Sequence, residues 1–274
     1  MMAKPSDGKN DIPARRGPLS SNSIRDELMS AGDRSVMTTA AEKKNYAEAL
    51  SRALALRFAN ALRPQFPGIL PDAQGKGQES RARTAKGVKK LDVNYSTSEL
   101  GLGLGVSIKT INFRDAKSGR YTKNYTRADG ELRAEASDYH VRQPYAVMVA
   151  VVFIPLDACY DAKKDPSSFG QAVKIFRFRG GREDPDADPN LFEAVFIGLY
   201  DTDPERFGET IFFDVRHAPP KAGRPQESLS FAELVDAIRR IYDQRNSPVF
   251  EWADASTEVL AAPVIDPDDE EDEN

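Results

Sequence analysis

The sequence predicts an α/β fold: a single domain with a central mixed β-sheet flanked by helices. Three observations support this prediction. Residues 146–154 are apolar at nearly every position, which is typical of a strand buried on both faces. Residues 100–113 alternate between small or polar and apolar side chains, as a strand with two different faces does. Amphipathic helical patterns precede, separate and follow these strands along the chain.

The helices are predicted from the spacing of apolar residues and from their end signals. Thr39 is the expected N-cap of the first long helix, and Pro64 ends it. The apolar stripe of this helix consists of Tyr46, Leu50, Leu54, Phe58 and Leu62. Residues 127–143 have helical spacing up to Pro144, and residues 230–246 form the last amphipathic helix.

The remaining strands are shorter. Residues 91–95 alternate, and residues 173–178, 192–199 and 210–215 are apolar segments separated by Gly, Pro and Asp. We predict a strand for each of these four segments. At the end of the segment 173–178, Arg177 and the following Arg179 alternate with phenylalanines and would project from one face, most simply into solvent and alternatively toward nucleic-acid phosphates.

Composition divides the chain into three parts. Residues 1–38 are rich in Ser, Pro, Gly and charged residues, so we expect a disordered segment with a short helix at residues 23–29. Residues 39–255 form the predicted α/β domain. Residues 256–274 form a disordered acidic tail, in which the last nine residues include seven acidic side chains. This tail dominates the net charge of −5, so the charge neither supports nor excludes a DNA partner.

Several classes of protein are disfavoured. The single cysteine, Cys159, excludes an intrachain disulfide and a Cys-rich zinc site. The apolar run at residues 146–156 is far shorter than the ~20 residues of a membrane helix. The polar N-terminus lacks the apolar core of a signal peptide. We therefore expect a cytoplasmic protein that does not bind membranes.

Three polar residues stand out on the first two strands of the predicted sheet. Asp92 lies on the polar face of the first strand. On the second strand, three glycines are followed by Ser107 and Lys109 on the same face. Glycines in a strand often mark a close approach by a neighbouring segment. A carboxylate that holds Mg²⁺ beside a lysine is suited to phosphodiester hydrolysis, because the ion activates water and the ammonium offsets charge on the phosphate.

A second carboxylate is expected from the following helix. Glu131 and Glu135 share a helical face with Asp138 and Arg142, because the four residues are spaced by four, three and four. Either glutamate could point back toward Asp92. A solvated helix face is the plainer interpretation of the same spacing.

At this point the chain resembles the PD-(D/E)XK nuclease superfamily, over about residues 92–155. The resemblance rests on Asp92, on Ser107-Ile108-Lys109, on the helix that follows and on the buried strand after it. The family has an acidic residue in place of Ser107, but a subgroup of restriction enzymes has Ser-x-Lys there and takes a glutamate from the next helix. Leu91 stands where the family often has proline, and Glu48 is the best match to a glutamate that a preceding helix often adds.

The resemblance implies a restriction-endonuclease-like fold and a Mg²⁺- or Mn²⁺-dependent DNA endonuclease of restriction or phage-defence type. Asp92 with Glu131 or Glu135 would bind the metal, Lys109 would position the nucleophile and Ser107 would assist. A homodimer or a partner protein from a defence system is the expected assembly. The alternative is a catalytically inactive nuclease-fold subunit that binds nucleic acid within a larger complex.

A basic stretch directly before Asp92 is the predicted contact with the DNA backbone. It consists of Arg81, Arg83, Lys86, Lys89 and Lys90.

Overall fold

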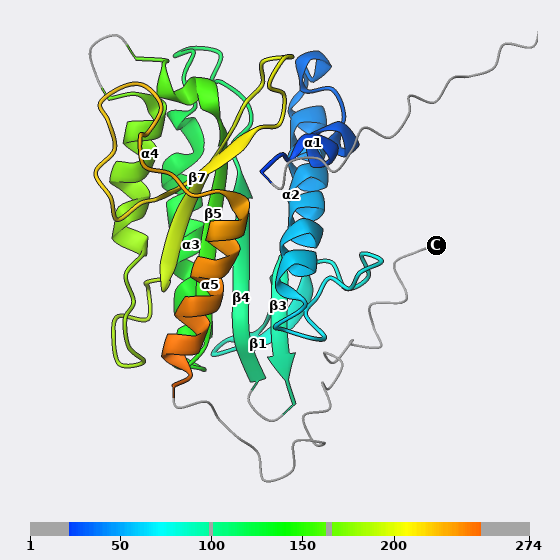
Figure 1. Ribbon diagram of the computed structural model, residues 1–274, viewed down its shortest axis with the longest axis vertical. Coiled ribbons are helices and arrows are strands. Elements are labelled where there is room, and N and C mark those ends of the chain that lie inside the picture. Colours follow the sequence, from blue (N-terminus) through cyan, green and yellow to red (C-terminus); the bar gives the residue numbers. More distant parts are fainter. Residues whose placement is uncertain (1–21, 99–100, 163–165, 248–274) are drawn as a thin grey trace, which may run out of the picture.

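The structure is a computed structural model that describes residues 22–98, 101–162 and 166–247. Its centre is a mixed five-stranded sheet with the strand order β3-β4-β5-β6-β7 (Figure 1). The outer pairs are antiparallel, and the two central pairs, β4 with β5 and β5 with β6, are parallel. The strands are β3 (Val93–Thr97), β4 (Gly101–Thr110), β5 (Val147–Pro155), β6 (Ala194–Tyr200) and β7 (Thr210–Asp214).

Helices cover both faces of this sheet. On one face lie α2 (Ala40–Leu62) and α5 (Phe231–Arg245), with α1 (Arg25–Ala31) packed on α2. On the other face lie α3 (Tyr125–His140) and α4 (Ser168–Phe176) (Figure 1). Every residue of β5 is buried, so the prediction of a strand covered on both faces is confirmed. The α/β class and the mixed sheet are confirmed as well.

The first long helix begins as its sequence predicts. The Thr39 side chain accepts a hydrogen bond from the backbone N–H of Glu42, and the Glu42 carboxylate accepts one from the backbone N–H of Thr39. This reciprocal arrangement satisfies N–H groups that a helix start leaves unpaired. The predicted stripe from Tyr46 to Leu62 is buried against the sheet.

Two short strands were missed by the sequence analysis. β1 (Ser80–Thr84) and β2 (Gly87–Leu91) form an antiparallel hairpin that is separate from the main sheet. Its turn is Ala85-Lys86, and Gly87 has a positive φ of 127° that suits glycine. The many basic side chains of the hairpin conceal the usual apolar alternation of strands.

The strand predicted at residues 173–178 is wrong. This segment belongs to α4 and to the 3-10 helix Arg177–Arg179 that follows it. The physical reason is the spacing of Phe169, Ala172, Val173 and Phe176, which are all buried and fall on one helical face. Arg177 and Arg179 therefore do not line one face of a strand. Arg179 instead pairs with Asp129 of α3, at 2.6 Å between Nε and Oδ1.

The N-terminal region is folded from residue 22 onward. The predicted helix at residues 23–29 corresponds to α1, whose Leu28 is buried, and a 3-10 helix follows at Arg34–Val36. Composition predicted that residues 22–38 are disordered. Composition counts residue types and does not show that a few apolar side chains pack here. The predicted acidic tail, residues 256–274, lies outside the described residues. Within the described ranges, no helix is long and apolar enough to cross a membrane.

Two further 3-10 helices complete the described fold, Thr122–Asn124 before α3 and Leu156–Cys159 after β5.

A buried ion cluster joins three elements at the end of the sheet opposite the carboxyl end of β4. The Glu193 carboxylate lies 3.0 Å from the guanidinium groups of both Arg182 and Arg245, and 3.4 Å from His140 Nε2. The Glu193 side chain is only 2% exposed. Burial alone would raise the pKa of Glu193, but His140, the Met148 N–H and Arg245 lower it below its usual value. His140 is thus part of a structural cluster.

Glu193→Gln should therefore destabilise the fold strongly. The substitution removes the anion and leaves two buried guanidinium groups without a counter-charge, a situation that typically costs about 3–5 kcal/mol. The check is the free energy of unfolding from urea titration. Glu183→Gln, at an exposed position in the same loop, serves as the matched control and should change it by less than ~0.5 kcal/mol. If both substitutions change the free energy of unfolding by similarly small amounts, the cluster contributes little to stability.

Candidate functional site

Strand pairing places Asp92 directly beside the Ser107-Ile108-Lys109 triplet. Asp92 is the single residue between β2 and β3, and its neighbour Val93 is the partner of Val106 in the antiparallel ladder. The Asp92 carboxylate accepts a hydrogen bond from the backbone N–H of Ile108, at 2.6 Å to Oδ2. The carboxylate is therefore fixed against the centre of the triplet.

Helix α3, which covers this face of the sheet, brings Glu135 to the same place. Alternation along β4 turns Val106 and Ile108 toward α2, and Ser107 and Lys109 toward α3. The Glu135 Oε2 atom accepts a hydrogen bond from Ser107 Oγ at 3.0 Å and lies 3.3 Å from Lys109 Nζ. The side chain of Glu135 is 13% exposed and that of Lys109 is 24% exposed. One carboxylate oxygen is thus shared by a hydroxyl and an ammonium in a mostly buried position.

The glycines that precede Ser107 make room for neighbouring side chains. A Cβ atom on Gly105 would lie 2.6 Å from Sδ of Met148 on β5 and 3.2 Å from a methyl group of Leu91. Real Cβ atoms are not found at the first distance, so a larger residue would force the Met148 side chain to move. The expectation of a close approach at this strand is met at Gly105 by side chains of neighbouring strands.

The charges of the three groups act on one another. Burial raises the pKa of Asp92 to about 7, and the negative charge of Glu135 adds to this rise. The Ile108 N–H and the ammonium of Lys109 partly oppose it. Burial alone would lower the pKa of Lys109, but Glu135, Asp92 and Glu131 together raise it above the usual value. Lys109 is therefore a permanent cation, whereas Asp92 titrates near neutral pH.

The two candidate glutamates have different positions. Glu135 contacts Ser107 and Lys109 directly. Glu131, one turn earlier on α3, is exposed and pairs with Arg127 at 2.9 Å. Its charge still reaches Lys109. The structure thus brings Glu135 into the cluster with Asp92, while Glu131 lies on the wall of the groove outside it.

This groove runs between the first half of α2 and the start of α3, past the carboxyl end of β4. Its volume is about 800 Å³, and Asp92 and Lys109 both line it. Glu48, the acidic residue singled out on the first helix, lines it too. Seven basic and five acidic side chains are on its walls. The basic ones are Lys43, Lys44, Arg52, Lys109, Arg114, Lys123 and Arg127.

Six of these basic residues were not selected from the sequence. Lys44 and Arg52 are on the exposed side of α2 and Lys43 borders its buried stripe, whereas Lys123 lies just before α3 and Arg127 in its first turn. The available signal was the position of these residues on segments that flank the strand carrying Lys109. Spacing alone did not indicate that the two helices face each other there.

The basic stretch of the hairpin makes mostly intramolecular contacts. Lys86 and Lys89 both form ion pairs with Asp138 of α3, and Lys90 pairs with Glu79 at 3.1 Å. Arg83 is exposed and Arg81 is partly buried. None of the five lines the groove, so their predicted contact with DNA would lie beyond it.

The carboxylates that could hold a metal ion are Asp92 and Glu135. Asp92 uses Oδ2 for the Ile108 N–H, and within the described part of the chain no hydrogen-bond donor contacts Oδ1. No three His, Cys, Asp or Glu side chains of the described residues are gathered as a metal-binding group. Mg²⁺ typically uses only one or two carboxylates together with waters and substrate phosphate. The pair therefore fits this ion better than it fits zinc or calcium.

Comparisons of the chain with models of protein families, with curated proteins and with solved structures gave no match.

The raised pKa of Asp92 predicts how stability depends on pH. Below about pH 4 this carboxyl is neutral in both the folded and unfolded chain. Between about pH 4 and pH 7 it stays neutral when folded but ionises when unfolded, so the unfolded state gains relative stability as pH rises. In chelator-containing buffer, Asp92 should lower the free energy of unfolding by at most about 1.4 kcal/mol per pH unit across this window.

The measurement is urea unfolding at several pH values for the wild-type chain and for Asp92→Asn. The difference between the two free energies of unfolding isolates Asp92 from all other titrating groups. As pH rises to about 7, the free energy of unfolding of Asp92→Asn should increase relative to that of the wild-type chain. Above that pH the difference should stay constant. A difference that does not change with pH would contradict the raised pKa.

Proposed function

We propose that this protein is a Mg²⁺-dependent DNA endonuclease with a restriction-endonuclease-like core. The observation that supports it is the position of Asp92, held by the Ile108 N–H, next to the ion pair of Glu135 and Lys109, at a groove lined by seven basic and five acidic side chains. Each residue comes from a different place in the chain, and together they supply a metal-binding carboxylate pair and a cation. Ser107 stands where the resembling family has its acidic residue, and Glu135 reaches that place from α3.

In this proposal the residues divide the chemistry as follows. Asp92 and Glu135 would hold the metal ion, whose chemistry when bound would be to polarise the scissile phosphate and lower the pKa of a bound water. Lys109 keeps its positive charge at neutral pH, so it orients the attacking water and offsets the charge that develops on the phosphate. Ser107 keeps the Glu135 carboxylate in position through its hydroxyl.

The groove supplies the route for the nucleic acid. Lys43 and Lys44 on α2, Lys123 just before α3 and Arg127 in its first turn all line the groove. Such side chains contact phosphates and set the register of a strand without reading its sequence. The phosphate that lies between the two helices would be the one nearest Asp92 and Lys109.

A second function has its own support. In the structure Glu135 already has two partners, Ser107 and Lys109, and Asp92 is half-neutral near pH 7. A site with these properties suits a nuclease-fold subunit that binds nucleic acid through the groove without cutting it. Such a subunit would serve within a defence complex or another nucleic-acid complex.

Plasmid cleavage with Mg²⁺ or Mn²⁺ tests the first function. The wild-type chain should nick or linearise the plasmid, and chelator should stop it. Lys109→Met should lower kcat by about 10²–10³, the usual cost of removing one group that stabilises transition-state charge. Asp92→Asn should abolish cleavage at all metal concentrations tested.

Matched substitutions separate the cluster from the groove. Glu135→Gln should abolish cleavage, whereas Glu131→Gln, one turn away on the same helix, should leave kcat unchanged. Lys123→Met should raise KM without lowering kcat, because this residue lines the groove outside the cluster. If the wild-type chain binds DNA without cutting it and Asp92→Asn binds equally well, the protein is the binding subunit.

A further inference from the structure

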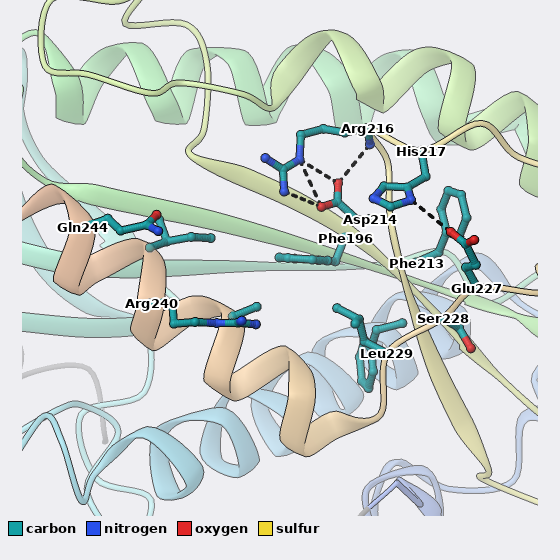
Figure 2. A pocket seen from close by; sticks show the side chains of 13 residues that line it. Phe196, Phe213, Asp214, Arg216, His217, Glu227, Ser228, Leu229, Arg240 and Gln244 are labelled. Carbon is teal, nitrogen blue, oxygen red and sulfur yellow. Dashed lines mark hydrogen bonds and ion pairs between the residues drawn. The ribbon is translucent and has the colours of Figure 1, made fainter.

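A second, smaller groove lies between the edge strand β7 and helix α5, on the sheet face shared with α2. Its volume is about 330 Å³, at the small end of the ~300–1,000 Å³ that ligand sites usually have. The floor is apolar and includes Phe212. Figure 2 shows two further apolar side chains of the lining, Phe196 and Leu229. Ala237, Arg240, Ile241 and Gln244 form the wall that α5 contributes. The groove therefore extends along most of the second half of this helix.

The charges on the rim are not equally neutralised. Arg216 forms a two-pronged ion pair with Asp214, and His217 lies 3.5 Å from Glu227 (Figure 2). Arg240 is exposed on the helix wall and donates one hydrogen bond to the backbone carbonyl of Asp236. Within the described ranges, no carboxylate pairs with Arg240. The groove thus combines an apolar floor with one cation that lacks a counter-charge.

The chain that leaves α5 has matching chemistry. Helix α5 ends at Arg245, one residue after Gln244 in the groove wall. Residues 249–254 are Val-Phe-Glu-Trp-Ala-Asp. In an extended segment Phe250 and Trp252 share one side and Glu251 takes the other, because successive side chains alternate. The segment can thus turn two aromatic side chains toward the apolar floor and a carboxylate toward Arg240 on the rim.

The distances also permit this contact. The wall from Ala237 to Gln244 spans seven helical steps, or about 10 Å at 1.5 Å per residue. From Ser247, five extended residues reach about 17 Å, at 3.3–3.6 Å per residue. A segment that turns back after α5 can therefore lay Trp252 beside Ala237.

We propose that residues 249–254 bind in the groove between β7 and α5, with Phe250 and Trp252 on its apolar floor and Glu251 paired with Arg240. This intrachain contact is independent of the Asp92 cluster and of the nuclease proposal. It buries the aromatic side chains of the segment against the apolar floor of the groove.

Trp252 makes the test direct, because it is the only tryptophan in the chain. The experiment measures its emission and its quenching by acrylamide in the full-length protein, at several protein concentrations and again in denaturing urea. The expected result is a blue-shifted emission and reduced quenching in the native protein, independent of protein concentration. Quenching equal to that in urea would overturn the proposal.

Substitutions in the groove locate the contact. Ala237→Phe fills the groove and should abolish the protection of Trp252, whereas Ala232→Phe, at an exposed position on the same helix, should preserve it. Arg240→Glu should weaken the protection, and the double variant with Glu251→Arg should restore it. Since Arg240 is exposed, this pair also gives a result if Ala237→Phe disturbs the fold.

Two outcomes contradict the proposal. Protection that persists in both Ala237→Phe and Arg240→Glu places Trp252 elsewhere. Protection that is lost on dilution assigns the groove to the segment of a second copy of the chain, and not to its own.

Discussion

The parallel pairing of β4 with β5 is the constraint on which the candidate site depends. Parallel strands cannot be joined by a tight turn, so the chain must cross one face of the sheet between them. Helix α3 makes this crossing, and β5 is apolar on both sides because helices cover both faces. The crossing brings Glu135 over the side of β4 that carries Ser107 and Lys109. The carboxylate reaches the strand because the topology requires a helix there.

The short side chain of Ser107 suits this arrangement. Ser107 is completely buried, and its hydroxyl donates to the carboxylate that comes from α3. A strand carboxylate in its place would put a third negative charge beside Asp92 and Glu135, with Lys109 as the nearby cation. Like charges at such separations raise one another's pKa values, as Glu135 already does for Asp92. Taking the second carboxylate from the helix keeps the count of buried anions at two.

Most elements of the fold followed from periodicity. The capped helix after Thr39, the fully buried β5 and the last helix have strong and long patterns, and all were predicted close to their observed ranges. The failures involve short segments. At residues 173–178 two phenylalanines separated by one residue suggested a strand, while the helical face begins earlier, at Phe169. The hairpin was missed because its strands are mostly basic or polar.

The candidate site was predictable in part. Asp92, Ser107 and Lys109 could be placed on one face by counting along two strands, and the structure brings them together. The choice between Glu131 and Glu135 was not predictable, because both share a helical face and only the rotation of α3 on the sheet distinguishes them. The groove could not be predicted from the sequence for a similar reason. It depends on the separation of α2 from α3, which is set by side chains packed elsewhere.

The basic residues of the hairpin also have a structural role beside the candidate site. Five basic residues before Asp92 suggested a surface for phosphates, yet Lys86 and Lys89 flank Asp138, whose pKa they lower although burial opposes this. The Tyr139 hydroxyl also donates to the carbonyl of Lys89, at 2.9 Å. These contacts tie β2 to the end of α3, the same helix that carries Glu135. Because Asp92 directly follows β2, the two lysines help to fix the distance between the two carboxylates of the site. Their positive charge therefore serves the geometry of the site.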